Sequence, residues 1–101
     1  QGGEHMRNYE IMYIVKASLE EAARQELVTS LHAIITNHGG VVKHVDEWGL
    51  REFAYPIDDM TKGYYSVIKV EAEPAAVKEF DRLARINTNV VRFLVLNLDE
   101  K

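Results

Sequence analysis

Few residues in this chain have the types and spacing that catalysis requires. The close acidic pairs outside helix surfaces and chain ends are Asp46 with Glu47, and Asp58 with Asp59. Paired carboxylates can act as general acid and base when their surroundings push their pKa values apart. The first pair falls on an expected edge strand and the second in an expected turn, and neither has a nearby candidate partner. We interpret both pairs as solvated surface.

Nucleophilic and metal chemistry have as little support. Ser18 has an expected role at the start of a helix, and no histidine is spaced to activate it as a nucleophile. The chain has no cysteine, which excludes thiol chemistry and argues against a structural zinc site. We interpret three histidines as ordinary surface or boundary residues: His32, His38 and His44. Gly39-Gly40 ends a helix and so is no phosphate loop. The sequence predicts no active site, metal, cofactor or small-molecule substrate.

Aromatic residues on the third expected strand raise the question of whether RNA bases stack on it. Lys62–Lys69 (KGYYSVIK) is superficially similar to the third-strand signature of RNA-recognition motifs. It departs where bases would stack, because Tyr65 replaces a small residue, and Ser66 and Lys69 replace aromatics. The sequence therefore disfavours a stacking platform of that kind.

Composition bounds the class of protein. With 101 residues, 47% of them hydrophobic, the chain suits one small globular domain. No run approaches the roughly 18 apolar residues of a membrane span, and a cytoplasmic location is the default. We interpret residues 1–5 as a remnant of cloning and residues 6–101 as the single domain. Without Glu4 there are 12 basic and 15 acidic residues, a net charge of −3. Any nucleic-acid binding must then be local or shared with a basic partner.

The order of expected elements is β-α-β-β-α-β. Ser18 and Glu21 form a capping box that predicts a helix over 19–38, ended by a left-handed glycine at Gly39-Gly40. Pro74 predicts the start of a second helix that ends near residue 86. Runs of branched and aromatic residues predict strands over 7–16, 41–54, 63–70 and 90–98, with a bulge at Gly49.

This order predicts an α+β ferredoxin-like sandwich, in which two helices cover one face of a four-stranded antiparallel sheet. The first and third strands should be central because they are the most apolar. In the first strand, Ile11, Tyr13 and Val15 should face the helices, and the other parity should face outward.

The stretch Gly49–Ile57 (GLREFAYPI) combines an arginine, two aromatic residues and a proline. It resembles the signature of the bacterial small-subunit ribosomal protein six family. Supporting stretches occur in the right order over the whole chain from residue 6: MRNYE at 6–10, DEWG at 46–49, KGYY at 62–65 and NVVR at 89–92. Phe53 stands where leucine is usual, and Asp58 where a basic or small polar residue is usual; the second departure puts a phosphate contact there in doubt.

The resemblance implies a non-enzymatic ribosomal protein of the cytoplasm. It would bind the central domain of small-subunit ribosomal RNA as a heterodimer with small-subunit ribosomal protein eighteen. The basic and aromatic residues expected at RNA are Arg7, Tyr9, Arg51, Tyr55, Lys62 and Arg92. Arg92 could instead pair with Glu10, and the helix arginines Arg82 and Arg85 should be solvated. The residues expected at the protein partner lie on the open sheet face and the second-strand edge: Glu10, Met12, Ile14, Trp48 and Leu94.

The alternative from another class is a ferredoxin-like homodimer that acts as an enzyme or a ligand sensor by stacking open sheet faces. It would need a polar pocket, for which the sequence offers no convergent acid, base or nucleophile. A ferredoxin-like interaction domain that does not bind RNA is the fallback interpretation.

Overall fold

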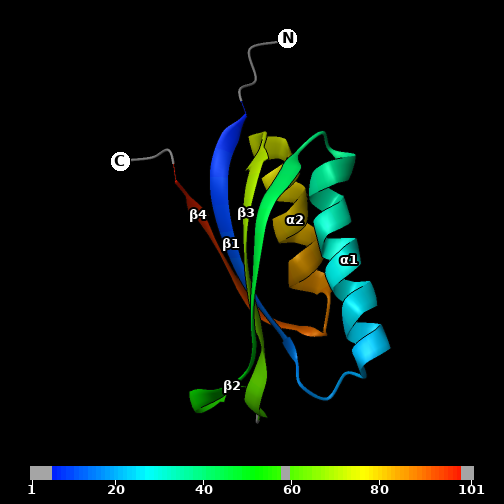
Figure 1. The fold of residues 1–101 in the computed structure, drawn as a ribbon, viewed down its shortest axis with the longest axis vertical. Helices are drawn as coiled ribbons and strands as arrows, with labels where there is room; N and C mark the ends of the chain where they lie inside the picture. Colours follow the sequence, from blue (N-terminus) through cyan, green and yellow to red (C-terminus); the bar gives the residue numbers. More distant parts are fainter. Residues whose placement is uncertain (1–5, 58–59, 99–101) are drawn as a thin grey trace.

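The computed structural model describes residues 6–57 and 60–98, and the predicted cloning remnant at 1–5 lies outside them. Its elements are β1 (Arg7–Lys16), α1 (Glu21–Asn37), β2 (Val41–Ile57), β3 (Met60–Ala72), α2 (Pro74–Ile86) and β4 (Val90–Asn97). The strands form one antiparallel sheet in the order β2-β3-β1-β4, with both helices on one face (Figure 1). The predicted ferredoxin-like sandwich is confirmed. No helix in the described part of the chain is long and apolar enough to cross a membrane.

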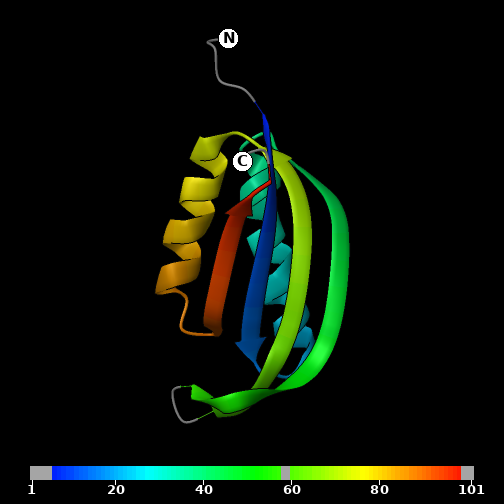
Figure 2. The ribbon, with the colours of Figure 1, turned by 90° about the vertical axis from the view of Figure 1, so that its left-hand side faces the viewer.

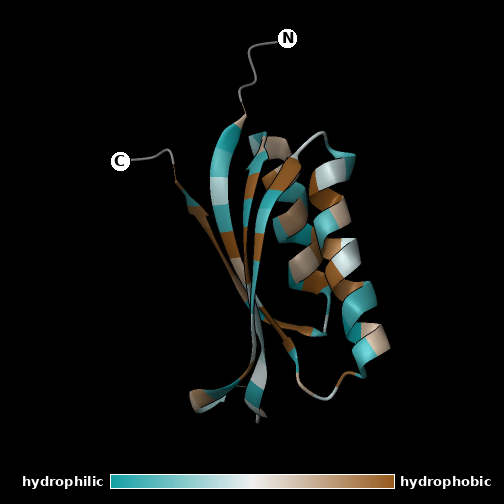
Figure 3. Cartoon of the chain, viewed as in Figure 1, coloured by the Kyte–Doolittle hydropathy of each residue, from teal (hydrophilic) through white to brown (hydrophobic). Residues whose placement is uncertain are grey.

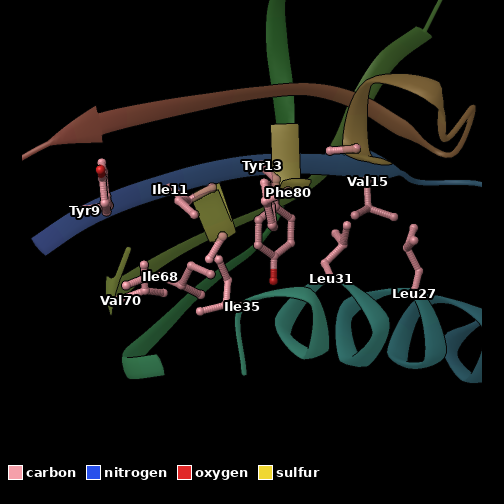
Figure 4. Close-up of a cluster of buried hydrophobic side chains, with 13 residues drawn as sticks. Tyr9, Ile11, Tyr13, Val15, Leu27, Leu31, Ile35, Ile68, Val70 and Phe80 are labelled. Atoms are coloured by element: carbon pink, nitrogen blue, oxygen red, sulfur yellow. The ribbon is translucent and has the colours of Figure 1, made fainter. Parts of the chain in front are cut away.

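The core lies between the sheet and the helices. Ile11, Tyr13 and Val15 of β1 are almost fully buried there, as their alternation predicts. The apolar stripes of both helices face the sheet (Figure 3), and α1 contributes Leu27, Leu31 and Ile35 to the cluster in Figure 4. The burial of both central strands fixes their register in the sheet and holds the helices against its inner face.

The start of α1 differs from the prediction. The helix begins at Glu21, and its N-cap is Glu20, which makes no side-chain capping bond. The predicted capping box of Ser18 and Glu21 is therefore wrong. Leu19 packs against the core, and its N–H donates to the carbonyl of Lys16 at 3.4 Å, which keeps Ser18 in a turn before the helix. The end was predicted correctly: Gly39 has a φ of +83°, and its N–H donates to the carbonyl of Thr36.

The β2–β3 hairpin extends beyond the end of β1 (Figure 2). The predicted bulge is confirmed, because Gly49 has a φ of +85° and the register shifts there. Both strands of the hairpin are longer than predicted, since β2 continues past residue 54 to Ile57 and β3 begins at Met60 instead of residue 63, with Met60 paired to Ile57. Residues 58 and 59 lie outside the described residues. Pro56 is tolerated because β2 is an edge strand.

The hairpin folds Phe53 over the open face of the sheet. Ile14, predicted to lie on this face for a partner, is only 3% exposed. A Cβ added at Gly63 would lie 2.7 Å from Ile14 Cγ2 and 3.1 Å from Phe53 Cζ, so the three residues are in close contact. The expectation that Ile14 serves a partner is therefore wrong for the folded chain, because its own hairpin covers it.

A buried polar pair links the sheet to α1. The Tyr13 hydroxyl lies 2.9 Å from His32 Nε2, and the two rings meet edge to face. Burial raises the pKa of Tyr13 to about 12 and lowers the pKa of His32, with a smaller opposing effect of Glu47 on His32. The Tyr13 hydroxyl and His32 Nε2 are each able to donate or accept, and the tautomer of the imidazole sets the direction of the bond. The pair satisfies two polar groups inside the helix–sheet layer.

Gly63→Ala tests the packing of the hairpin over the sheet. The new methyl would enter the space of Ile14 and Phe53, and we expect a loss of about 1–3 kcal/mol in the free energy of unfolding. The control is Thr61→Ala on the same strand, which is exposed and should change stability by less than about 0.5 kcal/mol. Urea unfolding measures both, and equal midpoints for the two variants would contradict this packing.

His32 should make stability depend on pH near neutrality. The unfolded chain binds a proton at His32 near its ordinary pKa of 6.5, but the folded chain binds it only at lower pH. The free energy of unfolding should therefore fall as the pH drops below about 6.5, by at most about 1.4 kcal/mol per pH unit. In urea titrations from pH 7.5 to 5, His32→Leu should flatten this slope, and His44→Leu on exposed β2 should keep it. A slope unchanged by His32→Leu would contradict the assignment.

Candidate functional site

Basic residues from four strands gather at the hairpin end of the sheet. Arg51 on β2 and Lys16 on β1 pair with the same β3 residue, Gly63, so they lie in one row across the sheet. Lys62 precedes that row on β3, and Arg92 lies near the start of β4, paired with Ile14. All except Lys16 are exposed or nearly so, and the fold brings together residues that are up to 76 positions apart. We call the three exposed residues Arg51, Lys62 and Arg92 the basic row; Arg51 and Arg92 lie on the open face, and Lys62, paired with Glu52, points to the other face.

Two predicted RNA residues lie elsewhere. Arg7 begins β1 at the opposite end, about 30 Å from Lys16 at roughly 3.3 Å per strand residue. Tyr9 is 7% exposed and belongs to the core cluster. The expectation that Tyr9 supports RNA binding is therefore wrong for the folded chain, because its parity turns the ring toward the helices. Tyr55 is 64% exposed on the hairpin and remains a candidate.

An aromatic cluster occupies the open face beside the basic row. Trp48 and Tyr65 stack with a ring separation of 6.2 Å and an interplanar angle of 5°, and Phe53 meets Tyr65 at 6.1 Å. The guanidinium of Arg51 lies 5.5 Å from the Trp48 ring, and its Nε donates to the Trp48 carbonyl at 3.4 Å. Trp48 remains 43% exposed, while its indole N–H donates to the carboxylate of Asp46 at 3.2 Å. The cluster fixes Arg51 at the surface and presents an amphipathic tryptophan.

An apolar row runs along the same face at the β4 edge. Leu94, Leu96 and Leu98 are 46–49% exposed, and we call them the leucine row. Met12 pairs with Leu94, and Glu10 pairs with Leu96; both are half-buried. Because β4 is an edge strand and largely apolar (Figure 3), this surface is typical of one that another protein covers.

The alternative pairing of Arg92 with Glu10 does not form. The register places Arg92 beside Ile14, two pairs away from the position of Glu10 on the same face. The helix arginines are exposed as expected, and each holds a nearby carboxylate on α2: Arg82 bonds to Glu79, and Arg85 bonds to Asp81 at 3.0 Å. Hydrogen bonding to Arg82 lowers the pKa of Glu79. Because Arg92 does not pair with Glu10, its guanidinium is available for a ligand at the basic row.

A cleft that the sequence did not indicate opens at the same end of the molecule. Its volume is about 650 Å³, and it lies where the β1–α1 turn, the start of β3 and the α2–β4 loop meet. We call it the end cleft; it is lined by Lys16, Ser18, Met60, Arg85, Asn87, Thr88, Val90 and Val91. No local motif could reveal it, because its polar residues come from separate parts of the chain and converge only through the sheet register.

The geometry of the acidic pair gives no basis for catalysis. Asp46 pairs with Val67 on the open face, and Glu47 pairs with Ser66, whose side chain is directed to the helix side. Neighbouring strand residues point to opposite faces, so these two carboxylates cannot act on one substrate. Within residues 6–57 and 60–98, no group of three or more potential ligands could hold a metal ion. The surfaces described above are therefore basic at the hairpin end and apolar along β4.

Comparison with known proteins identifies the family to which this chain belongs. The profile of the family "Ribosomal protein S6" matches residues 8–97. The small ribosomal subunit protein bS6 of Exiguobacterium sibiricum is 46% identical over 96 residues, which cover 95% of this chain and all of the relative. The crystal structure of 30S ribosomal protein S6 from Thermotoga maritima superimposes with a TM-score of 0.86 at 28% identity, covering 91% of this chain and 87% of that one.

The chain belongs to the ribosomal protein S6 family. The resemblance seen in the signature Gly49–Ile57 is therefore confirmed, and so is the non-enzymatic class of the protein. It is a structural component of the small ribosomal subunit, as expected. This excludes the alternative of a homodimeric enzyme.

Proposed function

We propose that this chain binds the central domain of small-subunit ribosomal RNA as a heterodimer with small-subunit ribosomal protein eighteen. The observation that carries the proposal is the separation of exposed basic residues from exposed apolar residues along the sheet, with Arg51, Arg92 and the leucine row all on the open face. The basic row lies at the hairpin end, and the leucine row follows along β4 toward the other end. One surface suits phosphates, and the other suits a protein.

The overall charge supports a shared mode of binding. The formal net charge is −4, so the chain as a whole repels a polyanion. Arg51, Lys62 and Arg92 supply a local basic surface, and Tyr55 offers an exposed ring beside it. A basic partner would supply the remaining phosphate neutralisation. Arg7, at the far end, lies outside this basic surface.

The partner surface follows from exposure. Met12 and Leu94 are neighbours on the open face, and the leucine row extends this patch along the edge strand. Glu10 is half-buried between Leu96 of β4 and Lys69 of β3, and its carboxylate could also meet a basic side chain of the partner. Trp48 lies at the other side of the face, where its exposed ring could anchor the same partner or RNA. The partner surface is therefore Glu10, Met12, Leu94 and Trp48, without the covered Ile14.

The direct test is a gel-shift titration of central-domain ribosomal RNA with this chain, with protein eighteen, and with both. We expect tight binding only with both proteins, because the acidic chain lacks the charge to bind alone. Protein eighteen alone binding as tightly as the pair would contradict the proposal. A scrambled RNA of equal length controls for nonspecific attraction.

Arg51→Ala tests the basic row within the heterodimer. Loss of one phosphate contact should weaken RNA binding and make the slope of log K against log salt shallower by about 0.7–0.9. The control is Arg82→Ala, which removes the same charge from the surface of α2 and should leave the slope unchanged. Equal slopes for Arg51→Ala and the unmodified chain would remove Arg51 from the RNA surface.

A further inference from the structure

We propose that the end cleft binds phosphodiester groups of the RNA backbone, with Lys16 and Arg85 as its cations. This inference rests on the proposed RNA-binding function and adds a site that lies outside the predicted RNA residues. The cleft, about 650 Å³ in volume, is within the range of protein ligand sites.

The loop that forms one wall of the cleft is held in shape. The Asn87 side-chain oxygen accepts from the N–H of Asn89 at 2.9 Å, and the N–H of Val90 donates to the Asn87 carbonyl at 3.1 Å. The N–H of Lys16 donates to the Asn89 carbonyl at 3.0 Å, which ties the loop to the end of β1. The loop is therefore positioned before any ligand arrives, which lowers the entropy lost on binding.

The lining offers donors of the kinds that hold phosphates. It contains one lysine, one arginine, two hydroxyl side chains and one amide, and among residues 6–57 and 60–98 no aspartate or glutamate lines it. Since the oxygen of Asn87 faces Asn89, the NH₂ group of that side chain is left as a donor. Ser18 makes no capping bond to α1, so the helix does not use its hydroxyl. Lysine, arginine, hydroxyl and amide groups are the usual side-chain contacts of nucleic-acid backbones.

Arg85 can exchange its present partner for a phosphate. Its guanidinium bonds to the two carboxylate oxygens of Asp81 at 3.0 and 3.1 Å and lies 5.8 Å from the Phe93 ring. Both side chains of the ion pair are well exposed, and an exposed pair of this kind is weak. Asp81 lies one helical turn away and does not line the cleft. A phosphate in the cleft would meet the same guanidinium together with the Lys16 ammonium.

The position of the cleft favours a chain of repeated negative charges, such as an RNA backbone, over an isolated anion. The cleft includes Val91, and the next residue along β4 is Arg92 of the basic row. On the other side, Lys16 shares its sheet row with Arg51. A backbone with a phosphate at every nucleotide can contact the basic row and the cleft in succession, and each contact adds to affinity. An isolated carboxylate would use only one of the two.

The test uses the full chain with protein eighteen and central-domain RNA. The variant is Lys16→Gln with Arg85→Gln, and the matched control is Lys43→Gln with Lys78→Gln, which removes equal charge near the opposite end of β2 and α2. We expect the cleft variant to lose about 5- to 50-fold in RNA affinity and to have a salt slope shallower by about 1–2, for two phosphates. The control should stay within about 2-fold. Circular dichroism and urea unfolding of each variant establish that it folds.

The outcomes separate the cleft from the proposed function. If the unmodified heterodimer binds RNA and both double variants bind equally well, the cleft proposal is overturned and the function stands. If the unmodified pair does not bind, the function itself fails.

Amide NMR titrations of residues 87–89 identify the ligand. We expect shifts with a short single-stranded RNA, and weaker ones with inorganic phosphate. Binding of a polyglutamate peptide as tight as that of the RNA would overturn the assignment to a phosphodiester.

Discussion

The register of β1 between β3 and β4 is the constraint on which the rest of the structure depends. Ile11, Tyr13 and Val15 are buried against the helices only in this register. A slip of one residue would turn these side chains outward and bury Glu10, at a cost of several kcal/mol. The same register places Lys16 and Arg51 in one row at the hairpin end. Packing on one face of the sheet thus determines where the charges lie at its end and on its other face.

Local concentration of charge reconciles an acidic chain with an RNA particle. Arg7, Lys43 and Lys69 lie elsewhere on the strands, whereas Arg51 and Lys62 lie where the hairpin reaches and passes the end of β1, and Lys16 and Arg92 lie close to them. The apolar surface lies apart from them, along β4. A protein with this division can join RNA on one side and a basic protein on the other, so its role in assembly follows from shape and charge and needs no chemistry of its own.

The sequence predicted the fold because strand alternation, the glycine cap at Gly39 and the order of elements all agreed. It mispredicted the start of α1, since packing of Leu19 outweighed a favourable capping pattern. It could not predict that Phe53 would cover Ile14, because this depends on how far and in which direction the hairpin folds. Tyr9 was read as an RNA contact from its type, although its parity with Ile11 already indicated burial. The end cleft was beyond reach, since three distant segments form it.

The central claim is that the hairpin end of the molecule faces RNA, and tethered cleavage tests it most directly. The chain has no cysteine, so single cysteines introduced as Thr88→Cys at this end and Ala75→Cys at the other end of α2 can each carry one iron–EDTA probe. In the complex with protein eighteen and central-domain RNA, hydroxyl radicals generated at position 88 should cut a defined stretch of RNA, and those from position 75 should cut little. Strong cutting from position 75 with none from position 88 would contradict the account.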